Sequence, residues 1–443
     1  MKINSIVLLF ALSLAFIIYI LQQRLNKVKF VPIIILMVWL LSTVFLFEFG
    51  PYIYPVKNKN LLYFYLAGVH LSLFMGYIKG AKVRMLDHIR KYKVKEILNF
   101  FMLGSVLYLL FNLPYFISSN SNIFSVIHGN VSTVRDIYVE TGGGRWNDYI
   151  SIFLFFFNNT FLILTIYYWE SAKFLVRCVF IIVFTFNLLS SVAMASRSGA
   201  FGALILIIFS FIAAHFSGKS RRNVPKILLV SSLLLALLLL YLNFISSARI
   251  PTGAFETQTP IPVGELNEDS IFFRVIPKYF YPLVFSGIQY SSHGYYGLSL
   301  CLEKPFIGIT FGVGQSMFLT RNFARFFDFD YIYYLSYQFR LVLEDEYSYL
   351  FADITAYPGI ASDVTFIGSI FVLFILGYLL ALAWKEVLVK HNPFAVVAFV
   401  TLSTAIIFFP MHSVLQDGNG FVNFYMVLIL WWFKRTRLVH KKV

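Results

Sequence analysis

The chain reads FLVRCVFIIVFTFNLLSSVAMASRSGAFGALILIIFSFIAAH from residue 174 to residue 215. Two apolar runs, 174–194 and 198–215, are separated only by Ala195, Ser196 and Arg197. Each run has roughly the 20 residues that an α-helix needs to cross the hydrocarbon core of a bilayer. Such runs must be helical because hydrocarbon cannot satisfy the hydrogen bonds of an open backbone. The stretch therefore predicts two membrane-spanning helices joined by a tight turn with an arginine at its tip.

Similar apolar runs recur along the whole chain. Of its 443 residues, 59% are hydrophobic and only 13% are charged, and the mean hydropathy is +0.76. A soluble domain has about twice that share of charged residues. We therefore expect an all-α polytopic membrane protein, with residues 1–443 as a single membrane domain of about eleven spans, within a range of roughly ten to twelve. The expected spans are 3–21, 30–48, 61–79, 97–116, 149–169, 174–194, 198–215, 227–245, 363–384, 394–410 and 421–433.

The basic residues are concentrated in every second connector between these spans. That set of connectors holds 23 of the 36 Lys and Arg residues but only 4 of the 21 Asp and Glu residues. Cytoplasmic connectors of membrane proteins carry such an excess of Lys and Arg. The pattern predicts a cytoplasmic C-terminus and an N-terminus outside. It also attributes the net charge of +15 to the membrane surface rather than to nucleic acid.

Two long connectors then face the outside of the membrane. The first outer loop covers residues 117–148 and the large outer loop covers 246–362. The large loop is rich in Tyr and Phe and is interrupted by Pro and Gly, so we expect short interfacial or re-entrant helices there. The chain has no P-loop, GxSxG, HExxH or Cys/His metal spacing. We therefore expect chemistry on the outer face, without a nucleotide, a cofactor or a metal.

Arg197 stands between two serines at the outer end of a predicted helix, in Ser196-Arg197-Ser198-Gly199. A helix N-terminus offers free amide groups and the positive end of the helix dipole, so an arginine there completes an anion site. The alternative is an arginine that extends to the lipid headgroups. Because an arginine within a membrane is costly, we favour a substrate-binding role for Ser196, Arg197 and Ser198.

The large outer loop contains further arginines. Arg321 and Arg325 are four residues apart, so they would share one face of a helix. Two guanidinium groups on one face suit a pyrophosphate, because each can bind two phosphate oxygens. Pairing with Asp328 and Asp330 is the alternative. The candidate substrate-binding arginines of this loop are Arg249, Arg274, Arg321 and Arg325, and Arg340 is a fifth loop arginine.

Two kinds of side chain are candidates for the catalytic base. The dense acidic group of the loop is Glu344, Asp345 and Glu346, followed by Asp353 and Asp363. Because a carboxylate can accept the proton of a sugar hydroxyl, Glu344 and Asp345 are candidate bases, and a solvated acidic run is the alternative. His293 is a rival base, although a lone loop histidine is more often structural. The loop Tyr and Phe side chains suit either stacking on sugars or anchoring at the membrane surface.

Four short stretches carry a resemblance to a known family. They are Ser196–Gly199, Ser292–Leu300 running on to Lys304-Pro305-Phe306, Phe311–Gly314, and Ala361–Gly368. With the layout of ten or more spans and a large outer loop in the second half, the chain resembles the oligosaccharide repeat-unit polymerases of bacterial surface polysaccharides, the Wzy-type or O-antigen polymerases.

The resemblance implies a nucleotide-independent glycosyltransferase of the bacterial cytoplasmic membrane. Such an enzyme polymerises undecaprenyl-pyrophosphate-linked oligosaccharides into surface polysaccharide on the outer face. The acceptor hydroxyl attacks the anomeric carbon of the donor, arginines stabilise the departing pyrophosphate, and a carboxylate or histidine takes the proton. The implied partners are the lipid-linked oligosaccharides, membrane lipid and a chain-length regulator, with no required metal.

Other functions remain open. A flippase or transporter for lipid-linked glycans would carry polar side chains deep in several spans; the main ones here are His70, Asn112, Asn158, Asn159 and Asn187. A ligase would use the same donor but transfer finished glycan to a different acceptor. A structural channel component is disfavoured by the arginines of the large outer loop.

Overall fold

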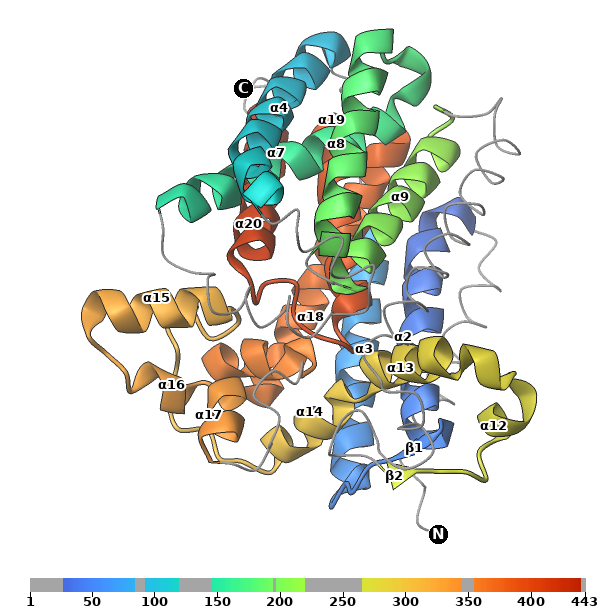
Figure 1. The fold of residues 1–443 in the computed structure, drawn as a ribbon, viewed down its shortest axis with the longest axis vertical. Helices are drawn as coiled ribbons and strands as arrows, with labels where there is room; N and C mark the ends of the chain where they lie inside the picture. Colours follow the sequence, from blue (N-terminus) through green and yellow to red (C-terminus); the bar gives the residue numbers. More distant parts are fainter. Residues whose placement is uncertain are drawn as a thin grey trace. The chain divides into compact units, whose positions relative to one another are not determined.

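Helices make up nearly all of the regular structure in the computed structural model, which describes residues 27–83, 92–118, 146–193, 197–219, 265–344 and 354–439 (Figure 1). The helices of the first half are η1 (Lys27–Phe30), α2 (Val31–Phe49), α3 (Lys59–Lys82), α4 (Val94–Ser118), α7 (Trp146–Tyr167), η2 (Trp169–Ser171), α8 (Phe174–Ala193) and α9 (Arg197–Phe216). Those of the second half are α12 (Ile271–Val275), η3 (Lys278–Phe280), α13 (Tyr281–Ser292), α14 (Gly294–Leu302), α15 (Met317–Phe327), α16 (Ile332–Leu335), α17 (Tyr337–Leu343), α18 (Ala356–Lys390), α19 (Pro393–Phe408) and α20 (Gly418–Val439). The described strands, β1 (Tyr52–Ile53) and β2 (Glu265–Leu266), form one short antiparallel pair.

Seven of the described helices are long and apolar enough to cross a membrane, so the chain is a multi-pass membrane protein. They are α2, α3, α4, α7, α8, α9 and α18. Helix α19 is apolar but only 16 residues long, and α20 covers the expected span 421–433. The expected spans 3–21 and 227–245 lie outside the described residues, so the count of eleven stays a prediction.

Residues 1–85, 254–382 and 405–421 form one compact unit, called unit 1 below. Within it, α3 and the middle of α18 form a close pair. A methyl group added at Gly76 would lie 1.9 Å from a backbone oxygen of α18, and one added at Gly377 would lie 2.0 Å from a backbone oxygen of α3. Small residues allow membrane helices to approach this closely. Tyr65 Oη and Ser369 Oγ, 2.6 Å apart and buried, add a hydrogen bond between the two helices.

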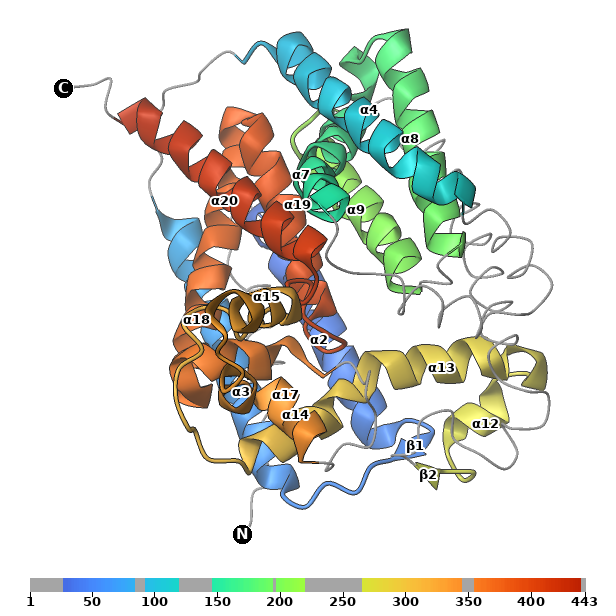
Figure 2. The same cartoon turned by 60° about the vertical axis from the view of Figure 1, so that its left-hand side comes forward.

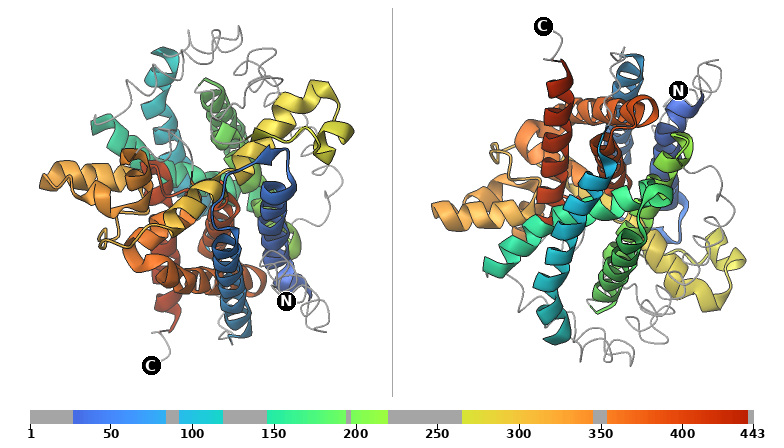
Figure 3. Two further views of the ribbon diagram at one scale, coloured as in Figure 1. Left: turned by 90° about the horizontal axis from the view of Figure 1, so that it is seen from below. Right: turned by 90° about the horizontal axis from the view of Figure 1, so that it is seen from above.

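The described part of the large outer loop folds as short helices within unit 1, from α12 to α17. Helix α13 packs against α2 and α14 packs against α3, and the yellow helices cross the blue ones in the left view of Figure 3. Tyr295 of α14 is fully buried. Its hydroxyl lies 2.9 Å from Thr43 Oγ1, six residues before the end of α2. The short helices were expected, whereas their re-entry into the membrane and the side of the membrane on which they lie stay predictions.

Helix α18 begins before its expected position. The apolar run predicts a start near Asp363, whereas the helix begins at Ala356 and contains a break at Thr365, with φ 67° and ψ 167°. The seven residues from 356 to 362 fall in the expected loop but form the first turns of this helix. Ser362 Oγ also accepts a hydrogen bond from Tyr337 N at 3.1 Å, which ties these turns to α17.

Residues 86–253, 383–404 and 422–443 form a second compact unit, called unit 2 below. Helices α4 and α7 pack against each other along most of their length. Gly104 of α4 faces the ring of Phe157 so closely that an added methyl group would lie 2.6 Å from it. Ser105 Oγ donates a hydrogen bond to Asn158 Oδ1 at 2.9 Å in the same buried contact. The polar side chain of Asn158 is thus used in helix packing.

Unit 2 also contains a buried carboxylate. Glu386, near the end of α18, is 1% exposed, and its Oε1 lies 2.8 Å from Arg435 Nε of α20. Its Oε2 accepts hydrogen bonds from Trp431 Nε1 at 2.9 Å and from Asn392 Nδ2 at 3.1 Å. A buried charge is tolerated when it is paired and hydrogen-bonded in this way. The contacts link the end of α18 to α20.

Candidate functional site

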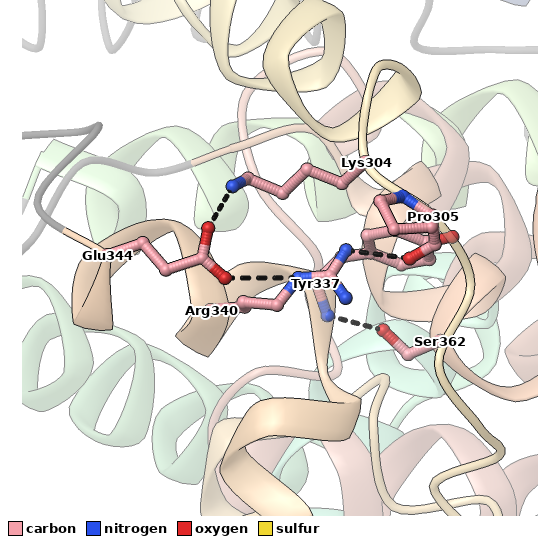
Figure 4. A network of polar contacts seen from close by, with 6 residues as sticks. All are labelled: Lys304, Pro305, Tyr337, Arg340, Glu344 and Ser362. Atoms are coloured by element: carbon pink, nitrogen blue, oxygen red, sulfur yellow. Dashed lines mark hydrogen bonds and ion pairs between the residues drawn. The ribbon is translucent and has the colours of Figure 1, made fainter.

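Two basic side chains meet one carboxylate where α14, α17 and the segment after α14 come together in unit 1 (Figure 4). Lys304 Nζ forms an ion pair with Glu344 Oε2, and Arg340 Nε lies 3.7 Å from Glu344 Oε1. The side chain of Lys304 is 10% exposed and that of Arg340 is 4% exposed, whereas that of Glu344 is 42% exposed. We call these three residues the Glu344 cluster.

Arg340 is held in place by contacts with neighbouring residues. Its Nη2 donates a hydrogen bond to Pro305 O at 2.9 Å, and its guanidinium carbon lies 5.0 Å from the centre of the Tyr337 ring. The first residue of α17, Tyr337, is itself tied to Ser362 through its backbone nitrogen. Glu344 directly follows α17, and its N–H donates a hydrogen bond to Arg340 O at 3.0 Å. It therefore continues the helical turn, which brings the side chains of Arg340 and Glu344 to the same side. The guanidinium group is therefore held by Pro305 and by the ring of Tyr337, whose backbone is bonded in turn to Ser362.

The Glu344 cluster has more positive than negative charge. Two cations that are largely shielded from water share one carboxylate, which is itself partly solvated. Arg340 Nε is buried and has no hydrogen-bond partner within the described residues, because 3.7 Å exceeds hydrogen-bonding distance. A buried donor without a partner is unfavourable, so an anion that reached it would be bound strongly. Arg binds phosphate oxygens through two N–H groups and Lys binds them as a point charge.

A second polar contact joins the segment that follows Lys304 to the first turns of α18. Asp363 Oδ1 accepts hydrogen bonds from Thr310 Oγ1 at 2.5 Å and from Gly312 N at 2.8 Å. Phe311 and Gly312 both have positive φ, 54° and 84°. Glycine adopts this backbone conformation without strain. No atom lies within 4 Å of a methyl group added at Gly312, so the backbone conformation, rather than a lack of space, favours glycine at this position. Two stretches of the family resemblance, 311–314 and 361–368, are therefore in direct contact.

Thr365 lies two residues after Asp363 and has an unusual backbone. Its φ of 67° and ψ of 167° fall in a region that is essentially restricted to glycine. A β-branched residue there stores about 1–3 kcal/mol of strain. Thr365 Oγ1 accepts a hydrogen bond from Gly368 N at 3.2 Å, as a helix N-cap does. Figure 2 shows α14, α15 and α17 gathered beside the first part of α18, where this break lies.

His293 is part of the packed interior of unit 1. It is 4% exposed, and its Nδ1 lies 2.7 Å from Gln289 O, one turn earlier. The next residue, Gly294, packs so closely on the 409–411 connector that an added methyl group would lie 2.4 Å from Pro410 O. Ser292 and Tyr295 are fully buried. The stretch around His293 therefore joins helices of unit 1, and its burial separates His293 from any solvent-borne substrate.

The predicted arginines lie in different places. Arg274 is exposed in the last turn of α12, and Arg321 and Arg325 are exposed on α15. The shared helical face of Arg321 and Arg325 is confirmed by the bounds of α15. Within the described residues, neither arginine forms an ion pair with Asp328 or Asp330.

The remaining candidates are described only partly or not at all. Arg197 and Ser198 are the first two residues of α9, in unit 2, as expected of a helix N-terminus, and their side chains are not described. Ser196, Arg249 and Asp345 lie outside the described residues. Glu344 is described and pairs with Lys304 and Arg340.

Sequence reasoning did not single out Lys304 and Arg340 as site residues. Lys304 is 40 residues from its partner Glu344, and no spacing rule connects such positions. Arg340 and Glu344 stand at i and i+4, the spacing of a helical ion pair. That spacing was the available signal for this part of the site.

The comparisons with known proteins return no relatives. The chain matches no protein-family model, no curated protein and no solved structure.

Proposed function

We propose that the protein is a membrane glycosyltransferase that joins lipid-pyrophosphate-linked oligosaccharide repeat units into a longer glycan. The observation that carries this proposal is the Glu344 cluster, in which two shielded cations both contact the partly exposed carboxylate of Glu344. A pyrophosphate between lipid and sugar carries more than one negative charge in a compact group. Lys304 and Arg340 match it in charge, and the unpartnered Nε of Arg340 supplies a further donor.

The cluster would act on the leaving group. As the bond between the anomeric carbon and the pyrophosphate oxygen breaks, negative charge grows on that oxygen. Donors fixed in advance, in a site with little water, stabilise such charge more strongly than solvent does. Pro305 and Tyr337 hold Arg340 in advance of binding. Glu344, which is more exposed than either cation, is the group that the incoming pyrophosphate would displace.

The proposal places the site on the outer face of a bacterial cytoplasmic membrane, with the C-terminus in the cytoplasm. Its support is the unequal distribution of Lys and Arg between alternate connectors. The apolar helices of the chain would accept the polyprenyl tails of both substrates. A chain-length regulator is the protein partner proposed with this function, as a modulator of product length that the transfer itself does not need.

Deletion of the gene in its host distinguishes a polymerase from the two alternative functions, a flippase and a ligase. A polymerase mutant makes and exports single lipid-linked repeat units but lacks long polymer. A flippase mutant retains its substrate on the cytoplasmic leaflet, and a ligase mutant accumulates long lipid-linked chains. Restoration of polymer by the wild-type gene but not by the Arg340→Ala gene supports the role of the Glu344 cluster. Either rival pattern contradicts the proposal.

A further inference from the structure

The transfer reaction needs a group that accepts the proton of the attacking hydroxyl, and the structure assigns this role to Asp363. The inference rests on the proposed function, because it concerns the acceptor half of the same site. Asp363 belongs to the acidic residues of the large loop, but its place beside Thr310 and Gly312 follows only from the fold.

The carboxylate of Asp363 is oriented through one oxygen and open at the other. Oδ1 accepts the hydrogen bonds from Thr310 and Gly312, whereas Oδ2 has no partner within the described residues. Asp363 is partly exposed, so Oδ2 can be reached by a hydroxyl group. A base must present a lone pair in a defined direction within hydrogen-bonding distance of the proton it removes. The two hydrogen bonds to Oδ1 fix the direction of the Oδ2 lone pairs of Asp363 before substrate binds.

The other candidate bases are less suitable in this fold. Both oxygens of Glu344 face cations, one from Lys304 and one from Arg340. Glu344 would have to release an ion pair before it accepted a proton. His293 is 4% exposed, and its Nδ1 is already engaged by Gln289 O. Among these three described side chains, only Asp363 is both partly exposed and unpaired at one acceptor atom.

The chain connects Asp363 to the Glu344 cluster on both sides. The segment from Pro305 to Gly312 contacts Arg340 at one end and Asp363 at the other. Ser362, next to Asp363, accepts the hydrogen bond from Tyr337, whose ring lies against Arg340. A base and a leaving-group site on the same short segments can act on one reacting sugar.

The strained backbone at Thr365 is consistent with this role. Strained residues persist where surrounding contacts over-determine them, and they gather at functional sites. Here the break lies between the segment that carries Asp363 and the long apolar part of α18. It allows residues 356–364 to follow the contacts with Thr310 and Gly312 instead of the axis of the membrane helix.

The acceptor hydroxyl oxygen forms a bond to the anomeric carbon of the donor, and the bond from that carbon to the pyrophosphate oxygen breaks. The electron pair of the broken bond stays on the pyrophosphate, next to Lys304 and Arg340. The hydroxyl proton moves to Asp363 Oδ2 and is later released to water.

Asp363→Asn is the informative variant, because the amide oxygen can still accept the hydrogen bonds from Thr310 and Gly312. Purified wild type and variant are compared in vesicles that contain one defined lipid-linked repeat unit. We expect the transfer rate of Asp363→Asn to fall by about 10²–10⁴-fold, while the dissociation constant for the lipid-linked unit stays within about twofold of the wild-type value and the thermal unfolding midpoint is unchanged. Asp330→Asn, an exposed carboxylate on the same loop, should keep the wild-type rate.

Two results would overturn the assignment. A transfer rate within about threefold of wild type would show that Asp363 is not the base. Loss of binding or of thermal stability in parallel with the rate would reduce Asp363 to a structural contact. Failure of the proposed function would be distinct, because the wild-type protein itself would then produce no polymer.

Discussion

Arg340 Nε and Glu344 Oε1 lie 3.7 Å apart at the C-terminal end of α17, yet the arginine side chain is 4% exposed and the glutamate side chain is 42% exposed. The pair is therefore unequal: the cation is fixed inside the protein and the anion reaches into solvent. An ion pair of this kind can exchange its carboxylate for another anion without moving the arginine. This relationship is the basis of the first two predictions.

Replacement of Arg340 removes the fixed cation. Arg340→Ala should lower the rate of polymer formation by about 10²–10³-fold, the usual effect of losing one preorganised donor to a developing negative charge. Arg340→Lys should recover little, because lysine cannot donate two parallel hydrogen bonds to a phosphate. Arg274→Ala is the matched control, since Arg274 is exposed on α12. Equal loss of activity in Arg274→Ala would remove the special role of Arg340.

Glu344→Gln distinguishes a base from a displaceable partner. If Glu344 competes with the substrate for the two cations, removal of its charge should tighten binding of inorganic pyrophosphate by about tenfold, or ~1.4 kcal/mol. Isothermal titration of the purified protein measures this directly. Weaker binding in Glu344→Gln than in wild type would contradict the account, and loss of transfer with unchanged binding would restore Glu344 as the base.

The close packing of α3 and α18 makes a prediction about stability. Gly377→Ala would place a methyl group about 2.0 Å from a backbone oxygen of α3, so it should force the helices apart and lower the thermal unfolding midpoint in detergent. Gly287→Ala in α13 is the control, because no atom lies within 4 Å of the added methyl group. Its midpoint should be unchanged or slightly higher, since alanine favours helices. Equal midpoints for the two variants would argue against the close approach.

Arg197 provides a test at a second position. Arg197 begins α9, where a helix N-terminus favours an anion. Arg197→Ala should abolish polymer formation with expression intact, and Arg197→Lys should recover little of it. Full activity of Arg197→Ala would identify the residue as a lipid anchor.

The orientation of the chain can be measured with reporter tags. Tags after Gly218 and Val443 should report the cytoplasm, and tags after Ser121 and Thr257 should report the outside, because the connectors rich in Lys and Arg stay in the cytoplasm. Protease protection in intact cells gives the same information independently. A cytoplasmic signal from Thr257 would place the large loop, and the proposed site, on the wrong face.

The membrane helices were predictable because their length and apolar character are set locally. The expected span 174–194 corresponds to α8, Phe174–Ala193, and the expected span 198–215 corresponds to α9, Arg197–Phe216. Each apolar run must end where polar residues begin, since hydrocarbon excludes them. The start of α18 was missed for the same reason. Ser362, the residue before the expected span, looks like a loop residue in sequence, but it lies in a helical turn that bonds to the loop.

The site was less predictable because it depends on packing between distant loop segments. The sequence identified an acidic group with Glu344 and a set of arginines, but no rule based on spacing links Lys304 to Glu344 or Thr310 to Asp363. His293 was a rival base in the sequence, although a lone loop histidine is more often structural. Its burial follows from contacts with α13 and the 409–411 connector, which only the fold reveals. The break at Thr365 was equally hidden, since a β-branched residue gives no signal for positive φ.

The central claim is that this chain alone joins lipid-linked repeat units. The most direct test is to incubate the purified protein, in vesicles, with one defined lipid-pyrophosphate-linked repeat unit and to separate the products by length. The account predicts a ladder of lengths without nucleotide sugar or ATP, abolished in Arg340→Ala and retained in Arg274→Ala. Recovery of only the starting unit from folded wild-type protein would contradict it.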